Sequence, residues 1–374
     1  MSFESKILEE NMPKLLFVTT APFYPDSSGG AELSTLYLFS RLCHLGWQVE
    51  VICSLSVRTG YLLGACILEL GRLRKPSISL MDRDLGYPCW RVITKNNTTH
   101  DWLVLLDQRL CEYKPDMVMG SPNPMCPLLT QAAHMGYPSF YYAHNLAAQE
   151  GGYKIPNKIH VIANAPYTAS QLSRMTQREM RVVLEMIDPE LYRVNKHDNR
   201  YITFINPIPE KGLHVAIEIA RSLPDECFLF VKGGWPGIND DYQASLLQPV
   251  RVIPNVEIWD NQKDMRSVYE VTDILLVPSQ FIETFGRVII EAQLNGIPVV
   301  AANVGGVPYT LGQGGILVTP KDSPAAYVDA LRQLRRSRSL YSDLSIAAIR
   351  NSERPEFDPQ QQVYNFIRIV ENFL

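Results

Sequence analysis

Residues 281–306 read FIETFGRVIIEAQLNGIPVVAANVGG and carry the most informative pattern in the chain. Its two glutamates, Glu283 and Glu291, stand eight positions apart. The apolar side chains of residues 287–296 recur at helical spacing, and Gly296 is a typical helix end. The apolar residues that follow predict a short buried strand. Glu283 is therefore expected in the loop before a helix, and Glu291 on that helix about two turns in.

The start of this predicted helix suits a phosphate group. The N–H groups of Phe285, Gly286 and Arg287 would have no partner within the helix, and the helix dipole adds positive potential there. One carboxylate beside the phosphate, at Glu283, and a second deeper in the site, at Glu291, would be unusual for a purely anionic ligand. A ligand that also presents hydroxyl groups, such as a nucleotide sugar, explains the pair.

The same segment resembles the donor site of retaining glycosyltransferases of the GT-B fold, in particular those of family four. That family carries two glutamates separated by seven residues, matched by Glu283 and Glu291, and a Phe-Gly pair after the first, matched at 285–286. A Gly-x-Pro-Val strand and a Gly-Gly turn are matched at 296–299 and 305–306. The resemblance implies two Rossmann-like α/β domains whose parallel sheets face a central cleft. An ordinary strand–loop–helix unit with solvated glutamates is the simpler alternative.

Length and composition agree with this fold class. The chain has 374 residues, which is long for one core and suits two α/β domains. Its 46% hydrophobic and 20% charged residues are typical of a soluble globular protein, and its net charge of −4 predicts no nucleic-acid partner. Seven cysteines without paired spacing favour reduced thiols in a cytoplasmic protein. No apolar run could span a membrane, and the first twelve residues lack a signal-peptide core, so we expect a loose tail.

Strand and helix patterns alternate along the chain, which is typical of a parallel sheet covered on both faces. The polar stretch 192–200 separates two such series. We therefore predict an N-terminal acceptor domain at 1–191, a C-terminal donor domain at 192–356 and a helix at 357–374 that, by analogy with the GT-B fold, crosses back to the N-terminal domain. The predicted strands are 15–19, 48–53, 116–119, 139–143, 159–163, 181–185, 201–205, 227–231, 256–259, 274–278 and 299–302. The predicted helices outside residues 281–306 are 31–45, 101–113, 124–135, 167–175, 211–222, 264–271, 324–336 and 340–351, besides the final one.

The loop after the first predicted strand contains Gly29 and Gly30. A strand, a glycine-bearing loop and a helix form the arrangement in which α/β folds approach phosphate. Without a side chain, the backbone can come close to a ligand. In the family that the chain resembles, the corresponding pair lies over the donor diphosphate and the acceptor. A simple glycine turn would give the same pattern.

His144 follows a predicted buried strand, at the sheet edge where open α/β folds bind ligands. The resemblance implies that this histidine bonds a hydroxyl of the transferred sugar and that its carbonyl stabilises positive charge at the anomeric carbon. An ordinary buried or surface histidine is the alternative. Asn164 resembles the small polar residue that the family places before the next helix. A helix N-cap explains it equally well, with Thr168 and Ser170 as competitors.

The third motif is INPIPEKG, which contains Asn206 and Lys211. Most family members have arginine at the first of these positions and lysine at the second, and both cations pair with the donor diphosphate. Asn206 removes one charge and the bidentate bonding of arginine to phosphate, although some family members also have Asn-Pro here. Arg287 could supply the missing charge, and an exposed helix-start lysine is the plain alternative for Lys211. Gly233, in the run KGG, would let a nucleotide approach, or it forms a simple turn.

The sequence does not predict a metal site. The Asp-Arg-Asp run at 82–84 is superficially similar to the Asp-x-Asp motif of metal-dependent transferases, but it lies in a polar stretch that predicts a loop. The resemblance implies instead that cations and a helix dipole stabilise the leaving diphosphate. No cofactor is therefore expected besides the nucleotide-diphosphate sugar, which is the donor substrate.

The resemblance implies a glycosyltransferase of class 2.4 that moves a sugar, most simply a hexose, to an acceptor hydroxyl with retention of configuration. Lys211 would take up charge as the diphosphate departs, and Glu283 would hold a hydroxyl of the donor sugar. Glu291 would hold the ribose hydroxyls. The predicted catalytic residues are His144, Lys211 and Glu283. The leaving phosphate can accept the acceptor's proton, and closure of the domains would exclude water.

The acceptor is not identified by the sequence and could be a small molecule, a glycan or a lipid-linked group. Residues 55–99 are predicted to form acceptor-facing loops and a helix. Their amphiphilic part, 61–75, could touch a membrane surface and make the protein weakly peripheral. Two other classes stay open. A catalytically impaired GT-B protein that only binds a nucleotide sugar would fit Asn206, and a nicotinamide oxidoreductase would need a Gly-x-Gly-x-x-Gly loop that the first loop lacks.

Overall fold

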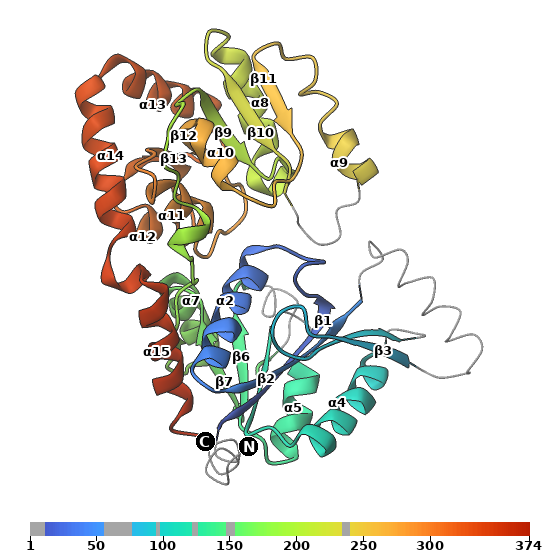
Figure 1. Cartoon of the computed structure of the whole chain (residues 1–374). Helices are drawn as coiled ribbons and strands as arrows, with labels where there is room; N and C mark the ends of the chain where they lie inside the picture. Colours follow the sequence, from blue (N-terminus) through green and yellow to red (C-terminus); the bar gives the residue numbers. More distant parts are fainter. Residues whose placement is uncertain (1–11, 56–76, 95–97, 122–125, 147–153, 234–239) are drawn as a thin grey trace. The chain divides into compact units, whose positions relative to one another are not determined.

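The computed structural model describes residues 12–55, 77–94, 98–121, 126–146, 154–233 and 240–374. Contacts along the chain divide it into two compact units. Unit 1 comprises Met1–Leu184 and Gln362–Leu374, and unit 2 comprises Glu185–Gln361. Each unit is built on its own β-sheet (Figure 1).

Unit 1 has an eight-stranded sheet of order β3-β4-β2-β1-β5-β6-β7-β8. Neighbouring strands are parallel except β3 and β4, which pair antiparallel at one edge. Its strands are β1 (Lys14–Pro22), β2 (Gln48–Ser54), β3 (Ser77–Asp82), β4 (Cys89–Thr94), β5 (Met117–Gly120), β6 (Ser139–Ala143), β7 (Ile159–Ala163) and β8 (Arg181–Val182). Its described helices include α2 (Gly30–His44), α4 (Thr99–Tyr113), α5 (Cys126–His134) and α7 (Pro166–Thr176).

Helices cover both faces of this sheet. On one face, Leu106 of α4 and Leu129 of α5 pack into a buried cluster with Val118 of β5. On the other, Phe39 of α2 meets Phe17 of β1 edge to face, with ring centroids 5.1 Å apart. Because both faces are buried, the central strands read as continuous apolar runs, which is why the sequence predicts them well.

The last helix, α15 (Pro359–Val370), carries the chain from unit 2 into unit 1. Phe366 lies 6.4 Å from the ring of Trp47, which precedes β2. The side-chain oxygen of Gln362 accepts a 2.9 Å hydrogen bond from the backbone N–H of Leu184. Apolar and polar contacts therefore join the end of the chain to the sheet of unit 1.

Unit 2 has a six-stranded, wholly parallel sheet of order β11-β10-β9-β12-β13-β14. Its strands are β9 (Tyr201–Ile205), β10 (Phe228–Val231), β11 (Val256–Trp259), β12 (Thr272–Val277), β13 (Val299–Ala302) and β14 (Gly315–Val318). Its described α-helices are α8 (Leu213–Ser222), α9 (Asp240–Leu246), α10 (Arg266–Val271), α11 (Arg287–Gln293), α12 (Val307–Leu311), α13 (Pro324–Arg336) and α14 (Arg338–Ser352).

The sheet of unit 2 is also buried on both faces. Ile219 of α8 and Leu331 of α13 pack with Phe204 of β9 on one face. Val268 of α10 packs with Leu229 of β10 on the other. Each fully buried side chain of this kind contributes about 1.5–3 kcal/mol. This core fixes where the strand ends lie, and those ends carry the polar residues discussed below.

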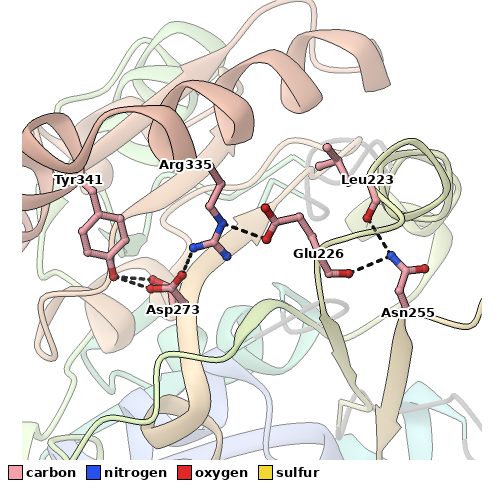
Figure 2. Close-up of polar contacts among 6 residues, drawn as sticks. All are labelled: Leu223, Glu226, Asn255, Asp273, Arg335 and Tyr341. Carbon is pink, nitrogen blue, oxygen red and sulfur yellow. Dashed lines mark hydrogen bonds and ion pairs between the residues drawn. The ribbon is translucent and has the colours of Figure 1, made fainter.

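A polar cluster lies at the amino ends of these strands, and we call it the amino-edge cluster (Figure 2). Asp273 of β12 forms an ion pair with Arg335 of α13 and accepts a 2.7 Å hydrogen bond from the hydroxyl of Tyr341 on α14. The guanidinium of Arg335 also donates to the carboxylate of Glu226 at 2.9 Å. The amide of Asn255 donates to the carbonyl of the same Glu226 at 2.9 Å. The buried carboxylate of Asp273 at this edge is therefore paired with a cation and a hydroxyl.

Several expectations for residues 55–99 need correction. Residues 77–82 and 89–94 are strands, where the sequence predicted loops and a helix. Asp82 is the last residue of β3 and bonds to Arg91, so the Asp-Arg-Asp run lies only partly in a turn. The two strands are short and flank a polar turn, so the sequence shows no clear strand periodicity there. The amphiphilic segment 61–75 lies outside the described residues.

Other differences concern short elements and element ends. The sequence did not predict α9, α12 or β14, which have seven, five and four residues. The helix expected from residue 211 begins at Leu213, after a 3₁₀ turn at Pro209–Lys211. Short elements carry too few residues for a periodic pattern, and turn geometry decides where helices begin. In the described residues, no helix is both long and apolar enough to cross a membrane.

Candidate functional site at the carboxyl edge of unit 2

The strand order of unit 2 identifies where a ligand would bind. Ranked by their order in the chain, the strands run 3-2-1-4-5-6 across the sheet, so the direction of winding reverses between β9 and β12. Open α/β sheets bind ligands outside the carboxyl ends of the strands at such a reversal. Asn206 and Lys211 follow β9, and Ser279 and Glu283 follow β12. Two of the three predicted catalytic residues therefore flank this point.

Lys211 and Glu283 meet there, although they stand 72 positions apart in the sequence. The ammonium nitrogen of Lys211 lies 2.6 Å from Oε2 of Glu283, and the hydroxyl of Ser279 donates to the same oxygen at 3.3 Å. The ammonium also lies 4.7 Å from the centre of the Phe281 ring. The two charged side chains remain 21% and 13% exposed, so a ligand can reach them. Ser279 and Phe281 were not predicted as site residues, although a polar residue just after a buried strand is a signal for one.

Backbone contacts hold the two loops together. Gly212, with φ +90°, ends the turn that carries Lys211, and a Cβ at this position would lie 2.0 Å from the carbonyl oxygen of Pro278. The N–H of Gln280 donates to the carbonyl of Glu210 at 2.9 Å. Only glycine allows this approach of the β9 loop to the end of β12. The N–H of Gly306 donates to the carbonyl of Glu283 at 2.7 Å and fixes that residue from the β13 side.

Arg287 has internal partners, and its proposed role toward phosphate stays a prediction. Its side chain is buried, and its guanidinium donates to the carbonyl of Met186 at 2.7 Å and to the hydroxyl of Tyr192 at 3.2 Å. Its Nε lies 3.3 Å from a carboxylate oxygen of Glu291. Burial lowers the pKa of Arg287, but Tyr192, Glu291 and Glu185 outweigh it and raise the pKa. Arg287 thus ties the first segment of unit 2 to α11.

Glu291 is also buried, one turn further along α11. Its Oε2 accepts a 2.7 Å hydrogen bond from the hydroxyl of Tyr269. Burial, followed by the charge of Glu291, raises the pKa of Tyr269 well above its ordinary value. The role of Glu291 toward ribose stays a prediction, and its carboxylate already has internal partners. Tyr269 was missed by the sequence because it lies 22 residues away, on α10.

The predicted phosphate position at residues 285–287 has a specific local structure. Helix α11 has only seven residues, and Gly286, with φ +84°, is its N-cap. The ring of Phe285 is buried and lies edge to face with Phe357, with centroids 5.9 Å apart. Only the backbone of these residues could therefore serve a ligand, and that contact stays a prediction.

Asn206 and Gly233 lie at the ends of adjacent strands. Asn206 adopts φ +63°, a left-handed conformation in which asparagine is enriched. A Cβ on Gly233 would lie 2.5 Å from the side-chain oxygen of Asn206, so the glycine is needed for this close packing. Lys232 directly precedes Gly233, and its ammonium donates to Asp260 at 2.7 Å. The second glycine of the KGG run lies outside the described residues.

The remaining predicted residues belong to unit 1. Gly29 is the N-cap of α2 and Gly30 its first residue, after the carboxyl end of β1. The strand winding of unit 1 reverses between β1 and β5, and a small hollow there is lined by Thr19, Glu32 and Ser121 among others. The two glycines therefore lie near the point where this sheet, taken by itself, would bind a ligand.

His144 directly follows β6, and its ring lies 4.1 Å from that of Tyr142. Its carbonyl accepts a 3.1 Å hydrogen bond from the amide of Asn164, whose oxygen accepts from the hydroxyl of Thr168 at 2.7 Å. The N-cap of α7 is Ala165, so the N-cap explanation of Asn164 is wrong. Asn164 instead fixes the backbone of His144. Among the described residues, no group of three or more His, Cys, Asp or Glu side chains could hold a metal ion.

Comparison with known proteins gives the segment that carries this site a family match. Residues 192–351 match the family model described as "Glycosyl transferases group 1". The D-inositol 3-phosphate glycosyltransferase of Corynebacterium diphtheriae is 32% identical over 151 residues, which is 38% of this chain and 35% of that protein. The chain thus spans about a third of the length of such curated relatives.

Solved structures resemble nearly the whole chain. The Anabaena protein HepE, solved in complex with UDP-glucose, gives a TM-score of 0.75 at 18% identity and covers 96% of this chain and 99% of that one. A glycosyltransferase from Rickettsia africae gives 0.73 at 17% identity, with 97% and 99% covered. These likenesses confirm the predicted α/β, GT-B fold class. The match of residues 192–351 to the glycosyl transferases group 1 model includes the motifs at 281–306.

Proposed function

We propose that this protein is a retaining, metal-independent glycosyltransferase that moves a sugar from a nucleotide-diphosphate sugar to an acceptor hydroxyl. The observation that carries the proposal is the contact of Lys211 with Glu283, 2.6 Å long, at the winding reversal of the unit 2 sheet. The contact lies within the segment that matches the glycosyl transferases group 1 model. A cation beside a carboxylate suits a ligand with both phosphate and hydroxyl groups.

The pair can exchange its internal contact for contacts with the donor. A diphosphate near Lys211 competes for the ammonium, which releases a carboxylate oxygen of Glu283 to accept a sugar hydroxyl. Lys211 then stabilises charge that grows on the diphosphate as it leaves. The leaving phosphate accepts the proton of the acceptor hydroxyl, so this scheme needs no separate base. From unit 1, we propose that Gly29 and Gly30 approach the diphosphate and that His144 bonds the transferred sugar.

UDP-sugars are the first donors to test, because HepE was solved with UDP-glucose. The family match lies within unit 2, so it supports the donor side of the reaction. Relatives named D-inositol 3-phosphate glycosyltransferase make a phosphorylated polyol one acceptor to include beside glycans and lipid-linked hydroxyls.

A second function is favoured by one specific observation. Asn206 stands where most family members carry an arginine, and Arg287 is buried among internal partners. A protein that binds a nucleotide sugar but transfers it poorly would fit this loss of charge. Binding without turnover would distinguish this function from the first.

The test measures binding first and turnover second. UDP, GDP and ADP, each beside its nucleoside monophosphate, are screened for a rise in melting temperature, since ligand at about 100 Kd stabilises the folded state by about 2.7 kcal/mol. We expect one diphosphate to raise the melting temperature more than its monophosphate. The matching nucleotide sugar is then incubated with the acceptors, and product is followed by mass spectrometry. The absence of a shift with every diphosphate would refute both functions.

A further inference from the structure

The diphosphate site proposed above holds fewer cations at the family's usual positions than the family pattern predicts. Asn206 replaces one of them, and the guanidinium of Arg287 is taken up by Met186, Tyr192 and Glu291. The lysine of the family pattern is present as Lys211, beside Glu283. A diphosphate carries more negative charge than one lysine neutralises, so a second cation is expected at this edge.

The strand register brings another cation to this edge. Ile205, Val231 and Trp259 pair across β9, β10 and β11. The residues that follow them, Asn206, Lys232 and Asp260, therefore form one row across three adjacent strand ends. Backbone hydrogen bonds continue into this row, with 2.8 Å from the N–H of Asn206 to Val231 and 2.9 Å from the N–H of Lys232 to Trp259. Lys232 is thus the direct neighbour of the position that lacks an arginine.

The partner of Lys232 is one that a ligand can replace. Its ammonium lies 2.7 Å from Oδ1 of Asp260, and the side chain of Asp260 is 84% exposed while that of Lys232 is 24% exposed. The hydrogen bond from Lys232 lowers the pKa of Asp260, so this carboxylate is charged near neutral pH. Ion pairs with such exposed partners contribute little to stability, because water screens them. A phosphate oxygen offers the same ammonium a charge-assisted bond at the ligand site.

The close packing of Gly233 on Asn206 keeps this row compact. A Cβ at Gly233 would collide with the side chain of Asn206, at 2.5 Å from its Cγ. The left-handed backbone at Asn206, φ +63°, suits asparagine better than arginine. The local backbone thus disfavours the cation at position 206, while the adjacent strand end supplies one.

We propose that Lys232 is the second cation of the donor site: its ammonium leaves Asp260 and binds a diphosphate oxygen, in the role that arginine has in most family members. The inference rests on the proposed function, and it assigns Lys232 as a binding and specificity residue for diphosphate over monophosphate. The competing explanation is a surface ion pair that only stabilises the loop.

The test uses two variants that break the same ion pair in opposite ways. Lys232→Ala removes the cation, and Asp260→Ala releases it. We expect Lys232→Ala to weaken the diphosphate that binds (UDP, GDP or ADP) about tenfold, which is about 1.4 kcal/mol, and to weaken its monophosphate much less. Asp260→Ala should bind the diphosphate at least as tightly as the wild type, and Lys232→Arg should retain most of the affinity. Calorimetric titration gives the affinities, and the melting temperature of each variant shows that it is folded.

Lys263→Ala is the matched control, because this exposed lysine lies three residues after Asp260 and should not change the affinity. Diphosphate affinity in Lys232→Ala within twofold of the wild type would overturn the inference and leave the proposed function standing. An equal loss for the monophosphate, or an equal loss in Asp260→Ala, would also overturn it. Failure of the wild type to bind every diphosphate would refute the proposed function itself.

Discussion

The two edges of the unit 2 sheet use charged side chains in different ways. At the amino edge, the side chain of Asp273 is 8% exposed and is held by Arg335 and Tyr341 from two helices (Figure 2). At the carboxyl edge, the side chain of Asp260 is 84% exposed and bonds to Lys232. A buried charge that loses its partner is costly, whereas an exposed charge is readily resolvated. The amino edge is therefore suited to stability and the carboxyl edge to exchange with a ligand.

The Lys211–Glu283 pair lies between these extremes. Its side chains are 21% and 13% exposed, and Ser279 gives the carboxylate a second donor. The pair is ordered by internal contacts and still open to a ligand. Exposure of the partner, more than the presence of an ion pair, thus indicates which charges a ligand can use.

The largest expected effect is on catalysis at the carboxyl edge. Lys211→Ala should lower transfer by a factor of about 100 or more, which is about 2.7 kcal/mol in activation free energy, because the leaving diphosphate loses its main cation. The melting temperature should change little. Turnover at saturating donor is compared with that of Lys196→Ala, an exposed lysine before β9 that should behave as the wild type. Wild-type turnover in Lys211→Ala would contradict the assignment of a ligand-binding role to the carboxyl edge.

The next effect is on stability at the amino edge. Arg335→Ala leaves the buried carboxylate of Asp273 without its cation, and should lower the free energy of unfolding by about 2–3 kcal/mol. Denaturant unfolding measures this loss, and diphosphate affinity at the opposite edge should be unchanged. Glu218→Ala breaks the exposed pair with Arg221 and should cost less than about 0.5 kcal/mol. Equal losses in the two variants would contradict the distinction between the edges.

The smallest effect is the pH dependence of the amino-edge cluster. Burial, and then the hydrogen bond to Asp273, raise the pKa of Tyr341 above its ordinary value of 10.0. The folded protein holds this proton more tightly than the unfolded chain, so the contribution is full below pH 10 and is lost as the pH rises toward the folded pKa. Tyr341→Phe should cost about 1 kcal/mol near neutral pH.

This cost should shrink above pH 10, because the wild type loses the stabilisation that comes from the protonated hydroxyl of Tyr341. The phenylalanine variant lacks that hydroxyl at every pH. Melting temperatures of both proteins across this range provide the measurement. A constant difference between them would show that the Tyr341 proton is not held by the fold.

Motifs with a fixed spacing are the part of the site that could be predicted. The run from Glu283 to Gly306 predicted the loop, the helix and the following strand, because helix, turn and strand patterns are local. The roles of His144, Lys211 and Glu283 remain predictions, although Lys211 and Glu283 are now seen in contact. The hairpin of β3 and β4 was missed, since its short strands flank a polar turn.

Two side chains show what local patterns cannot decide. Arg287, directly after Phe285 and Gly286, reads as an exposed cation at a helix start, but its guanidinium points to partners about a hundred residues earlier in the chain. Lys232 reads as part of a glycine turn, but strand register aligns it with Asn206 and Asp260. The direction of the Arg287 side chain and the strand register beside Lys232 come from the packing of the sheet. No local sequence pattern specifies either.

The amino-acid sequence was enough to predict the α/β class and the loop and helix that carry Glu283 and Glu291, because hydrophobic periodicity and glycine positions act within a few residues. Its motifs also underlie the match of residues 192–351 to the glycosyl transferases group 1 model. The tertiary structure alone decided which charges meet. Parallel strands joined by helices bring residues 72 positions apart to one edge, as for Lys211 and Glu283. The same packing buried Arg287 and left Asp260 exposed, since the free energy of a charge depends on the solvent and partners that the whole fold gives it.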